Sequence, residues 1–250
     1  MPRDVLDRLR DRFRNNVLWN LARTRELLRL LDLFDKEGMQ AIPYKGPVLS
    51  VMAYGDLSFR QFDDLDVFVR RDDVRKVMAM LSMEGYPLDF SLTPRQEELY
   101  LSSKNEYTLL APEKRTLLEV QWEVVPRYFS IPMATGDLFT RVRSVSLSGR
   151  ETMTFCPEDL VIILCIHGGK HGWERLAWIC DLANIIECHR EMDWEDILRQ
   201  AGQMRIEQMV LPVCPDRFFH CPWLWSGRRF GSDASQCCLF PSFGIQHGVI

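Results

Sequence analysis

The sequence predicts a mixed α/β (α+β) protein, with a mixed β-sheet flanked by helices and an α-helical C-terminal part. Three observations support this fold class. Apolar residues recur with the helical period of about 3.6 near the N-terminus and again in the second half. Stretches between them alternate apolar and polar residues with the strand period of about 2. At 250 residues, 46% of them hydrophobic, the chain can bury a substantial core.

Residues 5–34 are predicted to form one or two amphipathic helices. Gly38 breaks the pattern, and a short strand is expected over residues 41–44. The many arginines of the helices are interpreted as a solvated face rather than a nucleic-acid patch. Residues 1–37 are therefore expected to pack on the core as N-terminal helices. The apolar period is carried by Val5, Leu6, Leu9, Phe13, Val17, Leu21, Leu28 and Leu31.

The next strand contains the triplet Asp64-Leu65-Asp66. Successive side chains of a strand point to opposite faces, so the two aspartates share one face while Leu65 is buried behind them. Two converging carboxylates require a cation, and oxygen ligands suit a hard ion such as Mg²⁺, which is commonly shared with substrate phosphates. The triplet therefore favours nucleotide chemistry. The alternative is an edge strand whose acidic residues face water.

A glycine turn precedes this strand. Lys45-Gly46-Pro47 opens a segment compatible with a helix, and proline is well tolerated in a first helical turn. A glycine at a helix N-terminus lets phosphate oxygens approach backbone N–H groups. Lys45 and Arg60 add positive charge that can offset a triphosphate. Lys45, Gly46 and Arg60 are therefore candidate nucleotide-binding residues.

The remainder of the core is predicted to alternate helices and strands. Helices are expected over residues 74–85 and 93–101. Two strands, 107–111 and 116–124, are joined by the turn-prone residues 112–115.

Glu119 and Gln121 share one face of the second of these strands. If this strand lies beside the acidic one, Glu119 completes a carboxylate triad, whereas the alternative is an exposed strand glutamate. Glu123 is a weaker candidate because it follows the apolar motif. Residues 38–125 are expected to form the core of the protein.

Residues 126–149 are expected to be loop-rich, and helical periodicity returns from residue 157. Two packed helices are predicted up to residue 186, followed by one helix over residues 194–208. Residues 126–210 are therefore expected to form a helical C-terminal subdomain.

His167 and His171 are four residues apart, so on a continuous helix they would share a face. Because the sequence shows no third ligand, we favour a positioning role for these histidines over a metal site. In this role the histidines and Lys170 hydrogen-bond acidic partners such as Asp181 or contact substrate phosphate.

The tail, residues 211–250, mixes Cys, Pro, Trp, Phe and Gly without a sustained period. We interpret it as irregular, with a truncated or frameshifted end as the hypothesis. Cys237-Cys238 and His247 lack the spacing of a known metal clip.

Several of these motifs together resemble the uncharacterised nucleotidyltransferase family of the DNA polymerase β-like nucleotidyltransferase superfamily. The resemblance covers about residues 40–208 and has two departures. Pro47 stands where the superfamily commonly has Ser or Gly, and Gln121 stands where relatives often carry His. The matching residues are Lys45-Gly46, Tyr54-Gly55, Arg60, Asp64-Leu65-Asp66, Leu118 to Trp122, Pro157 to Leu160, His167, His171, Trp173, Leu176, Trp178 and Asp181.

The resemblance implies a nucleotidyltransferase-like fold with residues 38–125 as its catalytic core. It also implies Mg²⁺-dependent transfer of an NMP from an NTP to an unidentified acceptor hydroxyl or phosphate, with Mn²⁺ as an alternative ion. Asp64, Asp66 and Glu119 would be the catalytic and metal-binding residues. Two alternatives stay open: a catalytically inactive nucleotide- or partner-binding protein of the same fold, and a helical scaffold with an incidental Asp-x-Asp.

Composition and charge limit the kinds of partner and the location that we expect for the protein. The net charge of −4 disfavours a broad DNA-binding surface, so the acceptor is expected to be a small molecule, protein or RNA. No apolar run is long enough to span a membrane and the N-terminus is charged, so a cytoplasmic protein is expected. The eight cysteines show no Cys-x-x-Cys spacing and are interpreted as structural thiols.

Overall fold

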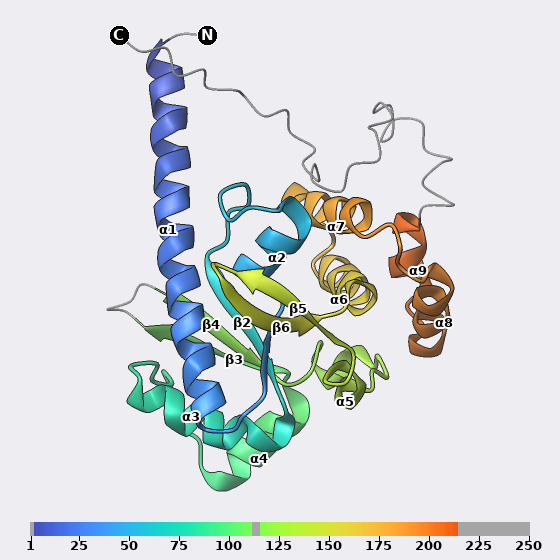
Figure 1. Ribbon diagram of the computed structural model, residues 1–250. Helices are drawn as coiled ribbons and strands as arrows, with labels where there is room; N and C mark the ends of the chain where they lie inside the picture. Colours follow the sequence, from blue (N-terminus) through green and yellow to red (C-terminus); the bar gives the residue numbers. More distant parts are fainter. Residues whose placement is uncertain (1–2, 112–115, 215–250) are drawn as a thin grey trace.

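The computed structural model describes residues 3–111 and 116–214, and it confirms the mixed α/β class (Figure 1). The predicted turn 112–115 and most of the predicted tail, 215–250, lie outside the described residues. The helices are α1 (Arg3–Lys36), α2 (Gly46–Tyr54), α3 (Val74–Met83), α4 (Pro94–Ser103), α5 (Thr135–Leu138), α6 (Pro157–Lys170), α7 (Leu176–Cys188), α8 (Trp194–Met204) and α9 (Glu207–Val210). The strands are β1 (Ala41–Pro43), β2 (Asp64–Val69), β3 (Glu106–Ala111), β4 (Thr116–Gln121), β5 (Val142–Leu147) and β6 (Arg150–Phe155). Three short 3₁₀ helices are η1 (Arg71–Asp73), η2 (Arg127–Phe129) and η3 (Leu211–Val213).

The main sheet is mixed, as predicted, with strand order β1-β2-β4-β3. β2 and β4 run parallel, and each has an antiparallel outer neighbour, β1 beside β2 and β3 beside β4. The acidic strand is therefore central rather than an edge strand. β4 ends at Gln121, earlier than predicted, because the N–H groups of Trp122 and Glu123 turn to the carbonyl of Asn105.

The two faces of this sheet contact different helices. On one face, Leu65, Val67 and Val120 pack with apolar residues of α1 and α3. On the other face, Phe68 packs with Phe155 and with the apolar side of α6. Because side chains alternate along a strand, Asp66, Glu119 and Gln121 lie on this second face, toward the C-terminal helices.

α1 is a single helix of 34 residues, one of the two options predicted for this segment. In Figure 1 its C-terminal half runs along the sheet and its N-terminal half extends past it. Asn20, which is fully buried on α1, donates to the carbonyls of Leu57 (2.6 Å) and Arg60 (2.7 Å). α1 thereby holds the loop that carries Arg60.

The prediction that residues 126–149 are loop-rich is wrong for the second half of that range. β5 and β6 form an antiparallel hairpin with a two-residue turn at Ser148-Gly149. Both turn residues have positive φ, 52° and 84°, as in the type I′ turns that match strand twist. The Ser-Gly pair was the available signal for this hairpin.

The C-terminal helices pack together around one core, and one detail differs from the predicted pattern. The helix predicted over residues 194–208 is divided into α8 and α9, because Arg205 adopts a left-handed conformation (φ 59°) that ends α8. Gly168 in α6 is needed for packing, since a Cβ there would lie about 2.4 Å from the Trp173 ring.

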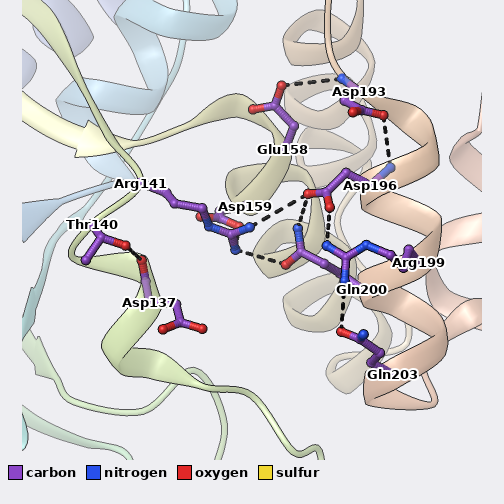
Figure 2. A network of polar contacts seen from close by, with 10 residues as sticks. All are labelled: Asp137, Thr140, Arg141, Glu158, Asp159, Asp193, Asp196, Arg199, Gln200 and Gln203. Carbon is purple, nitrogen blue, oxygen red and sulfur yellow. Dashed lines mark hydrogen bonds and ion pairs between the residues drawn. The ribbon is translucent and has the colours of Figure 1, made fainter.

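A polar network fastens the hairpin to these helices (Figure 2). Arg141, just before β5, donates to the buried Asp159 of α6 (2.5 Å) and to Gln200 of α8 (2.9 Å). Gln200 in turn donates to Asp196 (2.6 Å), so residues from three segments meet at one guanidinium. Within the described residues, no helix is long and apolar enough to cross a membrane.

Candidate functional site

Asp66 lies at the centre of the candidate site. Its side chain is fully buried on β2, and its Oδ1 accepts a hydrogen bond from the Lys45 ammonium at 2.9 Å. Burial opposes the charge of Lys45, but Asp66, Tyr44 and Glu119 together outweigh it, so the pKa of Lys45 is raised. Oδ2 of Asp66 is buried and has no hydrogen-bond partner among the described residues. One oxygen of this carboxylate is therefore paired, and the other is open.

Glu119 lies directly beside Asp66 because the two residues are partners in the parallel β2–β4 register. Burial, followed by repulsion from the Asp66 carboxylate, raises the pKa of Glu119 to about 8. Asp64 is two residues before Asp66 on β2, opposite Leu117, and is half-buried. Burial and then the Asp66 charge raise its pKa as well. The three predicted acids thus share a region where their negative charges disfavour one another.

Gln121 connects two of these acids. Its Nε2 donates to Glu119 Oε2 at 3.0 Å and to Asp66 Oδ1 at 3.4 Å. Its Oε1 accepts a short hydrogen bond from the Tyr44 hydroxyl. The sequence placed Gln121 on the same strand face as Glu119 but gave it no role. Its partner Tyr44 is 77 positions away, so the sequence pattern does not show the contact.

The glycine turn lies against the acidic strand. Gly46 begins α2 with φ 51°, and a Cβ at this position would lie 3.1 Å from the Asp64 carbonyl oxygen. A side chain at this position would be strained by the backbone conformation and crowded by β2. The positive end of the α2 dipole lies at the same turn, and Lys45 is the residue immediately before the helix.

Arg60 is placed differently from a free phosphate ligand. Its Nε donates to both carboxylate oxygens of the buried Asp181 on α7, each at 3.0 Å, and its NH1 donates to the Gly46 carbonyl at 3.4 Å. The Tyr54 hydroxyl also donates to Asp181, at 2.9 Å. Arg60 therefore ties the glycine turn to α7 while keeping its charge beside that turn.

His167, Lys170 and His171 lie where α6 ends, and α6 stops at Lys170. The two imidazole rings are 4.9 Å apart, and both contact the Trp178 ring. Burial, followed by the charge of Lys45, lowers the pKa of His167 to about 2, which indicates a neutral ring within reach of the Lys45 charge. Among the described residues, Asp181 accepts hydrogen bonds from Arg60 and Tyr54 instead of from these histidines, the partners that the sequence predicted.

The donor set suits a divalent cation. Asp64, Asp66 and Glu119 offer oxygens alone, and the open Oδ2 of Asp66 is a buried ligand atom without a hydrogen. A cation would also relieve the repulsion that raises the pKa of Glu119. Over residues 3–111 and 116–214, no group of three or more His, Cys, Asp or Glu side chains is arranged so that it could hold a metal ion, so the fit rests on the chemistry of the donors.

Comparison with known proteins agrees with these features. A family model described as "Uncharacterised nucleotidyltransferase" matches residues 1–214, beyond residues 40–208 that carry the resemblance. No curated protein matches the chain.

Two solved structures share the fold at low identity. The solution structure of the antibiotic-resistance factor ANT(2'')-Ia has 11% identity and a TM-score of 0.53, covering 80% of this chain and 99% of that one. A crystal structure of ANT(2'')-Ia in complex with adenylyl-2''-tobramycin has 11% identity and a TM-score of 0.50, covering 73% of this chain and 97% of that one. At this identity the likeness concerns the fold.

Proposed function

Because the chain belongs to the uncharacterised nucleotidyltransferase family, we propose that it moves a nucleoside monophosphate from an NTP to an acceptor hydroxyl or phosphate, with Mg²⁺ or Mn²⁺ as the metal. In this reaction an acceptor oxygen forms a bond to the α-phosphorus of the NTP. The bond from that phosphorus to the β-phosphate oxygen breaks, and pyrophosphate leaves with the electron pair.

The glycine turn is proposed to receive the triphosphate. The N–H of Gly46 is proposed to meet a phosphate oxygen at the start of α2, where the absence of a Cβ lets the helix pack against β2. The Lys45 ammonium, which is bonded to Asp66, and the Arg60 guanidinium, which is bonded to the Gly46 carbonyl, are proposed to supply positive charge. Arg60 acts in a fixed position, since Asp181 holds its Nε edge.

The carboxylates are proposed to hold the metal, with Asp64, Asp66 and Glu119 as its protein ligands. When bound, such an ion neutralises developing phosphate charge and favours the ionised acceptor oxygen. As an alternative to ligating the metal, Glu119 is proposed to accept the proton of the acceptor hydroxyl from its position beside Asp66. His167, Lys170 and His171 are proposed to orient the substrate from the end of α6.

The acceptor is proposed to be a small molecule that carries hydroxyl groups. The ANT(2'')-Ia complex contains an adenylylated small molecule, adenylyl-2''-tobramycin, in a protein of similar fold. The negative net charge of this chain also disfavours a long nucleic acid as acceptor.

One observation carries the proposal. Asp66, which is paired in register with Glu119, has a buried oxygen without a partner among the described residues. The test incubates the protein with each α-phosphate-labelled NTP, Mg²⁺ or Mn²⁺, and a panel of hydroxylated small molecules that includes aminoglycosides. We expect label to appear on one acceptor class.

Glu119→Gln is the informative variant, because it removes the proposed metal ligand or base while leaving the buried Lys45–Asp66 pair intact. It should lower transfer by at least about 100-fold. Glu123→Gln is the matched control, since Glu123 lies beyond the end of β4 and should transfer like the wild type. Binding of NTP without any labelled product would instead favour an inactive nucleotide-binding protein, and full activity in Glu119→Gln would remove the role of that residue.

A further inference from the structure

Gln121 is a buried amide that lies between two of the proposed metal ligands. Only 3% of its surface is exposed, and its Nε2 contacts both Glu119 and Asp66. These two acids face each other across neighbouring strands, so nothing in the strand geometry alone prevents their carboxylates from turning apart. A donor shared between them supplies that restraint.

The orientation of this amide is itself determined by Tyr44. The Asp66 carboxylate is paired with the Lys45 ammonium and accepts hydrogen bonds, so the amide must present its NH₂ group to Asp66, and the same group reaches Glu119. Its oxygen then faces Tyr44, whose hydroxyl donates to it. Burial is the main cause of the raised pKa of Tyr44, so this phenol keeps its proton. Tyr44 therefore prevents the amide from rotating by half a turn.

The same contacts determine which carboxylate atom stays open. Oδ1 of Asp66 accepts from both Lys45 Nζ and Gln121 Nε2, at 2.9 and 3.4 Å. Within residues 3–111 and 116–214, Oδ2 has no donor, although it is buried. A buried acceptor without a donor costs free energy unless a ligand or ion supplies the missing contact.

We propose that Gln121, held in one orientation by Tyr44, is a positioning residue that aims the free oxygens of Asp66 and Glu119 at a shared divalent cation. The inference rests on the proposed function and adds to it a pair of residues that do not touch the substrate. Residues that orient metal ligands typically change metal affinity about 10–100-fold when they are removed.

A purely structural Gln121 makes a different prediction. If the amide only satisfies buried hydrogen bonds, replacing it lowers the free energy of unfolding and leaves the metal affinity of the folded protein unchanged. The affinity of folded protein for Mn²⁺ alone, measured by calorimetry or by the electron spin resonance of the free ion, therefore separates the two roles. Neither measurement depends on turnover.

Four proteins are compared. Gln121→Met keeps the length of the side chain but removes both hydrogen-bonding groups, and we expect it to bind Mn²⁺ about 10–100-fold more weakly than the wild type. Gln121→His should retain affinity to within about threefold, because a neutral imidazole also has one donor and one acceptor. Gln200→Met is the matched control, since Gln200 is a buried amide in the separate Arg141 network and should leave Mn²⁺ binding unchanged.

Each outcome decides the matter. Equal affinity of the wild type and Gln121→Met overturns the inference and leaves the proposed function standing. Equal weakening by Met and His also overturns it, because the loss would then follow from packing rather than from the donor. A wild type that binds no Mn²⁺ in the presence or absence of NTP overturns the proposed function, and the inference with it.

Discussion

Glu119 combines two properties that are seldom found together in a surface glutamate: a half-buried position and a carboxylate neighbour at the paired position of the next strand. Burial and that neighbour both favour the protonated form, which explains the raised pKa. Without a cation, the residue therefore stores an unfavourable interaction. A divalent ion would offset this repulsion, because it would attract both carboxylates.

The stability of the metal-free protein should consequently depend on pH. Glu119 has a pKa of about 8 in the folded state and an ordinary value of 4.5, so between these values the folded state binds more protons than the unfolded state. The contribution of Glu119 is fully present below pH 4.5 and is lost as the pH rises through 8. We expect the melting temperature in EDTA to fall from pH 6 to pH 8.5, and the fall to be smaller in Glu119→Gln.

Mg²⁺ or Mn²⁺ should reduce this fall in the wild type, since the bound ion lowers the pKa of the carboxylates. A wild type and a Glu119→Gln variant with parallel melting profiles would show that Glu119 titrates normally.

Among the elements, the β5–β6 hairpin is connected to α6 and α8 through Arg141, which precedes it. Arg141 stands at the start of β5, and the carboxylate of Asp159 in the first turn of α6 is fully buried beneath it (Figure 2). Burial raises the pKa of Asp159 to about 6, although the Arg141 charge opposes this shift. Removing the arginine would leave this acid without its closest cation.

We expect Arg141→Leu to lower the free energy of unfolding by about 2–3 kcal/mol. Unpairing a fully buried ion pair typically costs about 3–5 kcal/mol, and the effect is smaller here because the Arg141 side chain is 37% exposed. Arg143→Leu is the matched control: its pair with Glu191 is exposed, so the change should stay below about 1 kcal/mol. Urea unfolding measures both, and adding Asp159→Asn to Arg141→Leu should recover part of the loss. Equal effects at positions 141 and 143 would contradict this account.

At the scale of the whole molecule, two apolar cores share one four-stranded sheet. One core contains Trp122 with α1 and α3, and the other contains α6 with Trp173 packed against it. The buried Arg60–Asp181 ion pair also connects the loop before β2 to α7. Neither core can be exposed without disturbing the sheet that both cover.

The protein should therefore unfold as one cooperative unit. With fluorine-labelled tryptophan, the folded resonances of Trp122 and Trp173 should lose intensity at the same urea concentration. Each resonance is assigned by replacing that tryptophan with Phe. Two separate midpoints would show that the sheet core and the helical part are independent units.

Local sequence pattern was sufficient for much of the core. The period of 2 predicted that Asp64 and Asp66 share a face of one strand and that Glu119 and Gln121 share a face of a second strand. The helical period located most of the helices. Family motifs within about residues 40–208 were also sufficient to identify the nucleotidyltransferase family, which the family model confirms. Periodicity and short motifs are properties of neighbouring residues, so a single chain reveals them.

Contacts between distant residues were not accessible in the same way. Arg60 and Asp181 are 121 positions apart, and Tyr44 and Gln121 are 77 apart, yet each pair shares a buried hydrogen bond. The parallel register of β2 and β4 likewise decides that Glu119 lies beside Asp66 rather than on a separate surface. Burial and pairing depend on which remote segments meet in the folded chain, and these set the charge state, orientation and partners of every side chain in the candidate site.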